Sequence, residues 1–90
     1  MLPGIGHFAM PGLAPQSAAV GRTLGAVDLL AKTGASVVAI ERDGDVIAQP
    51  KPGEGLRRGD VLALSGSQDA VRDAALLLAQ PRDIEVTSSF

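Results

Sequence analysis

The side chains that could carry out chemistry are few in this chain of 90 residues. A hydrolase or transferase needs a nucleophile, a base and a group that stabilises developing charge. The single histidine, His7, lies in a Gly- and Pro-rich segment, where we expect a solvent-exposed residue rather than a general base. One histidine and no cysteine do not supply the donors of a typical zinc site. We therefore predict no catalytic residue, no metal ligand and no enzyme.

Three carboxylates alternate along the chain at Glu41, Asp43 and Asp45. Carboxylate oxygens are the ligands that hard cations prefer, so a cation site is one interpretation. The intervening Asp43–Gly44 pair tolerates the positive φ angles of a type I′ turn. We favour the second interpretation, in which these carboxylates form the solvated end of a hairpin.

Glycines recur in the segment GEGLRRG, residues 53–59. A phosphate-binding loop needs a strand before it and a helix after it, usually with a Lys and a Ser or Thr. Here a strand-like run follows the glycines, so the context predicts turns rather than a phosphate loop.

Arginines remain as candidate anion-binding groups, because a guanidinium can donate two parallel hydrogen bonds to a phosphate. The candidates are Arg42, Arg57 and Arg58, and for each of them plain surface charge is the competing interpretation. Arg42 stands out because it ends an apolar run and so need not be fully exposed.

The composition limits the possible classes of protein. Hydrophobic residues make up 46% of the chain and are mostly aliphatic, which is ample for a core, and the net charge is −2. A nucleic-acid-binding protein usually has a basic surplus and aromatic platforms, so we expect no nucleic-acid partner. The absence of cysteine is compatible with a reducing cytosol. Charges at Arg22, Asp28 and Lys32 interrupt the apolar runs, so we expect no membrane insertion.

The first half of the chain predicts a helix and a hairpin. Thr23 is a plausible N-cap, and Gly34 a natural stop, for one helix of about two turns. Residues 36–42 (SVVAIER) are rich in β-branched residues and nearly continuously apolar, which predicts a strand buried on both faces. Asp43–Gly44 then turns the chain into a returning strand at residues 45–49.

The second half predicts a further strand and helix. Pro50 and Pro52 end the returning strand because proline lacks the N–H that a sheet requires. After a polar loop at 51–60, residues 61–65 (VLALS) form a strand, and a helix capped by Ser67 runs to about residue 79. Residues 84–87 (IEVT) are a candidate final strand.

These elements predict an α+β fold, with an antiparallel or mixed sheet of three to five strands and two helices on one face, in the order β-α-β-β-β-α. We divide the chain into an irregular leader or linker at residues 1–18, with room for one short edge strand, and a domain at residues 19–90. A domain of this size is only marginally stable alone, so dimerisation would add useful buried area.

Short motifs follow one another at regular spacing between residues 19 and 77. They are a G-x-T-L helix start, an L-x-x-x-x-G-x-x-V-x-A-I-x-R-x-G core, an I-x-x-P-x-P exit and an L-x-x-G-D-x-L-x-x-x-G strand. The matching residues are Gly21, Thr23, Leu24, Leu29, Gly34, Val37, Ala39, Ile40, Arg42, Gly44, Ile47, Pro50, Pro52, Leu56, Gly59, Asp60, Leu62 and Gly66. This ordered set resembles the RCK C-terminal domain, also called the TrkA-C domain, over about two-thirds of the chain.

The resemblance implies a cytosolic, homodimeric regulatory module on potassium channels, Trk- or Ktr-type uptake systems, or monovalent cation/proton antiporters. Such modules bind a small effector at the dimer interface, in several bacterial members cyclic di-AMP, and thereby gate transport. By similarity, the ligand-binding residues would be Val37, Val38, Ala39, Ile40, Arg42, Gln49 and Pro50. Many members have an asparagine where this chain has Gln49. The family's nucleotide-binding N-terminal domain has no counterpart here, so we expect no NAD or ATP cofactor, and cyclic di-AMP or another nucleotide only as effector.

Two other hypotheses accompany this one. The same fold could serve as a purely structural homodimerisation module without a ligand, because apolar β-branched strands suit a self-complementary interface. A small enzyme is the third hypothesis, with His7 as its only obvious base. The identity of the effector and of the transported ion are not encoded in any motif that we find.

Overall fold

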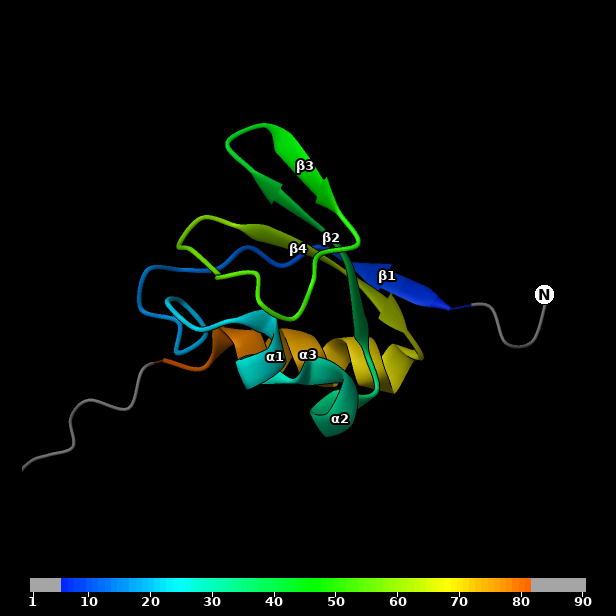
Figure 1. Ribbon diagram of the computed structural model, residues 1–90. Helices are drawn as coiled ribbons and strands as arrows, with labels where there is room; N and C mark the ends of the chain where they lie inside the picture. Colours follow the sequence, from blue (N-terminus) through cyan, green and yellow to red (C-terminus); the bar gives the residue numbers. More distant parts are fainter. Residues whose placement is uncertain (1–5, 82–90) are drawn as a thin grey trace, which may run out of the picture.

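The fold was determined as a computed structural model, which describes residues 6–81. A four-stranded antiparallel sheet has the strand order β1-β4-β2-β3, and the helices all lie against one face of it (Figure 1). The elements are β1 (His7–Ala9), α1 (Leu24–Val27), α2 (Leu29–Thr33), β2 (Ser36–Arg42), β3 (Asp45–Ala48), β4 (Val61–Gly66) and α3 (Gln68–Ala79). The predicted α+β class and element order are confirmed. The candidate strand at 84–87 falls outside the described residues.

The β2–β3 hairpin forms as predicted. Asp43 and Gly44 both have positive φ, 53° and 84°, as a two-residue type I′ turn requires. Arg42 pairs with Asp45 across the turn, and Ile40 pairs with Ile47. The turn therefore fixes the register that brings Ile40 to the covered face of the sheet.

The predicted single helix is wrong: it is two short helices separated by Asp28. Asp28 adopts a left-handed conformation (φ 53°, ψ 54°), and its N–H donates to the carbonyl of Leu24. Val27 and Leu29 are both buried, yet residues two apart on one α-helix point about 200° from each other. The break at Asp28 lets both side chains reach the core. Thr23 and Gly34 do cap the two ends of this helical segment.

The prediction that β2 is buried on both faces is also wrong. Ile40 is completely buried on the helix side, whereas Val38 is 40% exposed and Glu41 is exposed. The pairing of β2 with β4 is irregular between Val37 and Ala39, which places Val38 at a β-bulge. Within the described residues no element covers the second face of the sheet, so the apolar run there stays accessible.

The core lies between the sheet and the helices. It is built from buried residues of β2, β4, the helices and the segment before α1: Leu13, Val27, Leu29, Ile40, Leu62, Leu64, Val71, Ala74 and Leu78. The leader contributes directly, because β1 pairs with β4 and Leu13 is buried. Ser17 is buried too, and its hydroxyl donates to the carbonyl of Leu78 over 2.7 Å. The domain division at residue 18 stays a prediction.

A substitution at Gly66 would test how closely this core is packed. A Cβ at Gly66 would lie 3.3 Å from Ala35 Cα, which is tighter than ordinary contact, and 3.4 Å from Ala70 Cβ. We expect Gly66→Ala to lower the free energy of unfolding by about 2 kcal/mol, because the methyl group crowds the Ala35 backbone and φ 159° is a conformation that side chains rarely adopt. Gly53→Ala is the control, since a Cβ there would meet nothing within 4 Å. Urea unfolding measures both, and equal stabilities for the two variants would contradict the close packing.

Candidate functional site

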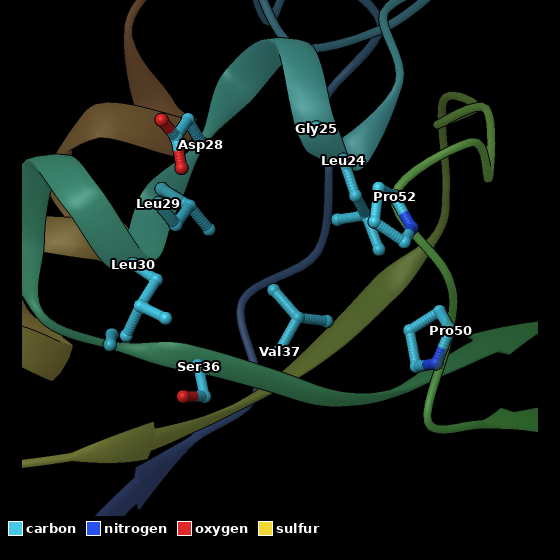
Figure 2. Close-up of a pocket in the computed structure, with 10 residues that line it drawn as sticks. Leu24, Gly25, Asp28, Leu29, Leu30, Ser36, Val37, Pro50 and Pro52 are labelled. Carbon is cyan, nitrogen blue, oxygen red and sulfur yellow. The ribbon is translucent and has the colours of Figure 1, made fainter.

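A pocket of about 280 Å³ opens between the first two helices, the start of β2 and the chain that follows β3 (Figure 2). Its lining residues come from these four segments: Leu24, Gly25, Asp28, Leu29, Leu30, Ala35, Ser36, Val37, Pro50 and Pro52. The lining is mainly apolar, with Asp28 as its one charged side chain and Ser36 as its hydroxyl group. Apolar walls with a few polar groups are typical of small-molecule sites.

The helical wall of the pocket follows from the break at Asp28. The left-handed residue turns the chain between α1 and α2, so Leu24 from one helix and Leu30 from the other both border the pocket. Leu30 lines the pocket and yet is 62% exposed. This side of the pocket therefore offers an apolar rim to solvent.

The opposite wall is formed by the loop after β3, and backbone hydrogen bonds join it to α1. The N–H of Gly25 donates to the carbonyl of Pro52 over 2.8 Å, and the N–H of Leu24 donates to that of Glu54 over 3.0 Å. A Cβ at Gly25 would lie 3.2 Å from Pro52, so the absence of a side chain permits this approach. The helix and the loop thus form one connected wall.

Of the seven residues expected by similarity, Val37 and Pro50 line this pocket. Val37 is partly buried at its floor and Pro50 lies on the loop wall, as Figure 2 shows. The sequence analysis did not single out the lining residues from the two helices or Pro52. Gly25 and Asp28 could have indicated the helical wall, because both are poor helix formers within one short predicted helix.

The structure places the other expected residues outside the pocket lining. Ile40 is completely buried in the core, Val38 lies exposed at the bulge, and Ala39 pairs with strands on both sides. Gln49 adopts φ 48°, a left-handed conformation that asparagine accepts more readily than most residues. Whether an effector touches any of them remains a prediction.

Arg42 is held by an internal network rather than pointing freely to solvent. Its Nε and Nη2 donate to the two carboxylate oxygens of Asp60 over 2.9 and 2.7 Å. Nη1 donates to Glu54 Oε2 over 3.2 Å, and Nη2 also donates to the carbonyl of Gly55 over 2.8 Å. Contact between Arg42 and an effector, as similarity suggested, stays a prediction.

Electrostatics in this network favour the charged forms. The hydrogen bonds from Arg42, and next the one from the Arg57 N–H, hold the pKa of Asp60 below its ordinary value of 3.8 against the opposing effect of burial. Hydrogen bonding to Asp60 in turn raises the pKa of Arg42. Asp60 is 1% exposed, so its charge depends on these donors for compensation.

Residues 6–81 contain neither a metal-binding cluster nor a membrane-spanning helix. No cluster of three or more His, Cys, Asp or Glu side chains that could hold a metal ion occurs there. None of the helices in that range has the length and hydropathy needed to cross a bilayer.

Comparison with known proteins identifies the fold. The family model of the TrkA-C domain matches residues 13–79. No curated protein sequence matches the chain significantly. Among solved structures, the RCK_C domain dimer of S. agalactiae BusR in complex with c-di-AMP has a TM-score of 0.70 at 24% identity, over 82% of this chain and 95% of that one. The RCK C domain of the potassium transport protein KtrA, also with c-di-AMP, has a TM-score of 0.71 at 21% identity, over 79% and 81%.

Longer proteins contain the same fold as one part. BusR in complex with promoter DNA matches with a TM-score of 0.71 at 24% identity, over 87% of this chain but 37% of that one. The GsuK channel bound to NAD matches with a TM-score of 0.71 at 29% identity, over 82% of this chain and 14% of the channel. The chain therefore spans a minor part of these larger proteins, and the DNA and NAD belong to those complexes.

The buried charge at Asp60 predicts a loss of stability in acid. A lowered pKa means that its contribution is complete above the ordinary pKa and is lost as the pH falls through the lower, folded-state value. We expect Asp60→Asn to lower the free energy of unfolding at pH 7 by about 3 kcal/mol, because it leaves Arg42 without its main partner. The variant should also lose less further stability than the wild type between about pH 5 and pH 2.

Urea unfolding across this pH range measures both effects. Asp73→Asn is the control, because Asp73 is an exposed carboxylate beside Arg72. If the wild type and Asp60→Asn lost equal stability on acidification, the assigned role of Asp60 would be wrong.

Proposed function

The chain belongs to the TrkA-C domain family, and on that premise we propose that it is a regulatory domain that binds a small effector in the pocket beside β2. Its proposed setting is the cytosolic face of a monovalent cation channel, transporter or antiporter, to which it is fused or bound as a separate subunit. The observation that carries the proposal is the pocket itself, whose floor and loop wall contain Val37 and Pro50.

The chemistry of the pocket favours a flat, largely apolar group such as a nucleobase. The walls are leucine, valine and proline side chains, and Asp28 can accept a hydrogen bond from an amino group. No arginine or lysine is among the lining residues, so a phosphate group would lie outside the pocket, away from Asp28. Cyclic di-AMP, with two adenines and two phosphates, fits this division and is the effector that we propose to test first.

A second copy of the chain is the proposed partner at the open side of the pocket. The exposed side chain of Leu30 forms an apolar rim there, and burying it against its symmetry mate would remove apolar surface from water. A two-fold interface brings the same residues together from both copies, so two pockets would face each other. An effector with two bases could then occupy both.

Regulation would follow from the difference in affinity between two arrangements of the dimer. An effector that binds one arrangement more tightly shifts the population toward it, and a covalent or bound transporter would sense the change. We propose no enzymatic activity and no NAD or nucleic-acid partner for this chain. Its expected lack of nucleic-acid binding rests on the net charge of −2 and is not tested by the DNA complexes of the longer BusR.

A ligand-free homodimerisation module is the second candidate. It is favoured by the uncovered face of the sheet, where Phe8 is 73% exposed and Val46 is 68% exposed. Exposed apolar patches on small domains often mark interfaces. Under this candidate, the dimer would form through the sheet and would be indifferent to nucleotides.

Leu30 and Leu76 provide a matched test of the first candidate. Both are helical leucines with nearly equal exposure, 62% and 61%, but Leu76 lies on α3 and outside the pocket lining. We expect Leu30→Glu to weaken c-di-AMP binding at least tenfold, because it places a charge at the rim, whereas Leu76→Glu binds like the wild type. Calorimetric titration measures the affinity, and sedimentation gives the oligomeric state with and without c-di-AMP.

A thermal shift panel separates the two candidates. A ligand that binds only the folded state raises the melting temperature, by an amount that grows with the logarithm of its concentration relative to Kd. We expect a shift with c-di-AMP and a smaller one with AMP, which has one base and cannot bridge two pockets. A dimer that sediments normally but shows no shift with any nucleotide would favour the structural module.

A further inference from the structure

The loop that forms one wall of the pocket contains no helix or strand, so something else must hold it in place. Pro50 and Pro52 line the pocket, yet the loop continues to Asp60 before β4 begins. A loop of this length that forms part of a binding site needs anchors, because its backbone entropy opposes a fixed position. Its anchors are found by following its hydrogen bonds.

The loop is first joined to α1. The carbonyls of Pro52 and Glu54 accept from Gly25 and Leu24, and an isolated bridge pairs Thr23 with Gly55. These bonds make α1 and the loop a single unit. Val27 of α1 and Leu56 of the loop are buried in the core and hold that unit against the sheet by apolar packing.

Arg42 supplies the polar connection between this unit and the end of β2. It is the last residue of β2, its guanidinium holds Glu54 and the carbonyl of Gly55 within the loop, and it also holds Asp60 immediately before β4. The side chain of Arg42 is 14% exposed, and those of its partners Glu54 and Asp60 are 30% and 1% exposed, so water screens these bonds only in part. One side chain therefore clamps the middle of the loop and its C-terminal end to the end of β2.

We propose that Arg42 is a positioning residue of the effector pocket: without contacting the lining, it fixes the loop and, through the loop, the start of α1. This inference rests on the proposed function only for the identity of the ligand. The position of the α1–loop wall relative to β2 then depends on a guanidinium at this position. A residue with the same charge but another shape would leave the protein folded, but the α1–loop wall of the pocket would be less firmly held.

The test compares Arg42→Lys with the wild type. Lysine keeps the positive charge beside Asp60, so folding is expected, but an ammonium cannot form the two-pronged bond and also reach Glu54 and Gly55. Glu54→Gln is the milder second variant, because it weakens one bond to Arg42 and leaves Asp60 paired. Ser17→Ala is the stability control, since Ser17 is buried and hydrogen-bonded to Leu78 but lies outside the pocket.

Amide hydrogen exchange measures the stability of the α1–loop wall directly and needs no ligand. We expect the amides of Leu24 and Gly25, which donate to the loop, to lose about tenfold in protection in Arg42→Lys. The amides of Leu62 and Val71, which donate to Pro11 and Ser67, should keep their protection after correction for global stability. In Ser17→Ala, Leu24 and Gly25 should behave like the wild type after the same correction.

Affinity for c-di-AMP is the second readout, measured where every variant is more than nine-tenths folded. A merely structural role changes the apparent affinity only by the unfolded fraction, whereas a loose wall should weaken binding about fivefold in Arg42→Lys and less in Glu54→Gln. Selective loss of protection with weaker binding supports the proposal. Uniform loss of protection, or unchanged protection at Leu24 and Gly25, overturns it. If the wild type does not bind c-di-AMP, the proposed effector is wrong, and the exchange measurement still decides the role of Arg42.

Discussion

A buried carboxylate needs a compensating cation, and in this small domain the compensation of Asp60 by Arg42 organises everything around the pocket. Asp60 stands immediately before β4 and Arg42 ends β2, so their ion pair lies at one end of the two central strands. The same guanidinium has bonds left for the loop, because it donates to more than one acceptor. Stability of the sheet and placement of the loop therefore depend on one interaction, and a change that weakens it acts on both.

The second constraint is geometric and lies in the helical segment. Burying both Val27 and Leu29 is incompatible with one continuous helix, and the left-handed Asp28 resolves the conflict. The break costs helical hydrogen bonds and places a non-glycine residue at positive φ, a conformation that is common at functional sites. In exchange, the two short helices spread apart at the pocket and expose Asp28 to it. The pocket thus exists because the core required a break in the helix.

Short sequence patterns were sufficient to predict the fold but not to predict the site. The Asp43–Gly44 turn, the caps at Thr23 and Ser67 and the β-branched strand act within a few residues, so their patterns predicted the α+β order correctly. The break at Asp28 depends on which side chains the sheet buries. The exposure of Val38 depends on a β-bulge in the pairing of β2 with β4. Neither follows from the residues next to it in the sequence. Arg42 was singled out as a possible anion ligand from its position alone. Its partners Glu54 and Asp60 lie 12 and 18 residues away, a distance over which one sequence carries no signal of contact.

A division of labour between these two constraints explains how such a pocket can serve regulation. The core residues Ile40, Leu62 and Leu64 are completely buried and resist change in shape, because packed interiors do not deform continuously. The α1–loop unit is joined to that core by the buried side chains of Val27 and Leu56 and by the polar bonds of Arg42 to Glu54, Gly55 and Asp60. Under the proposed function, an effector that contacts Pro50 or Leu24 would act on the wall that Arg42 ties to the end of β2.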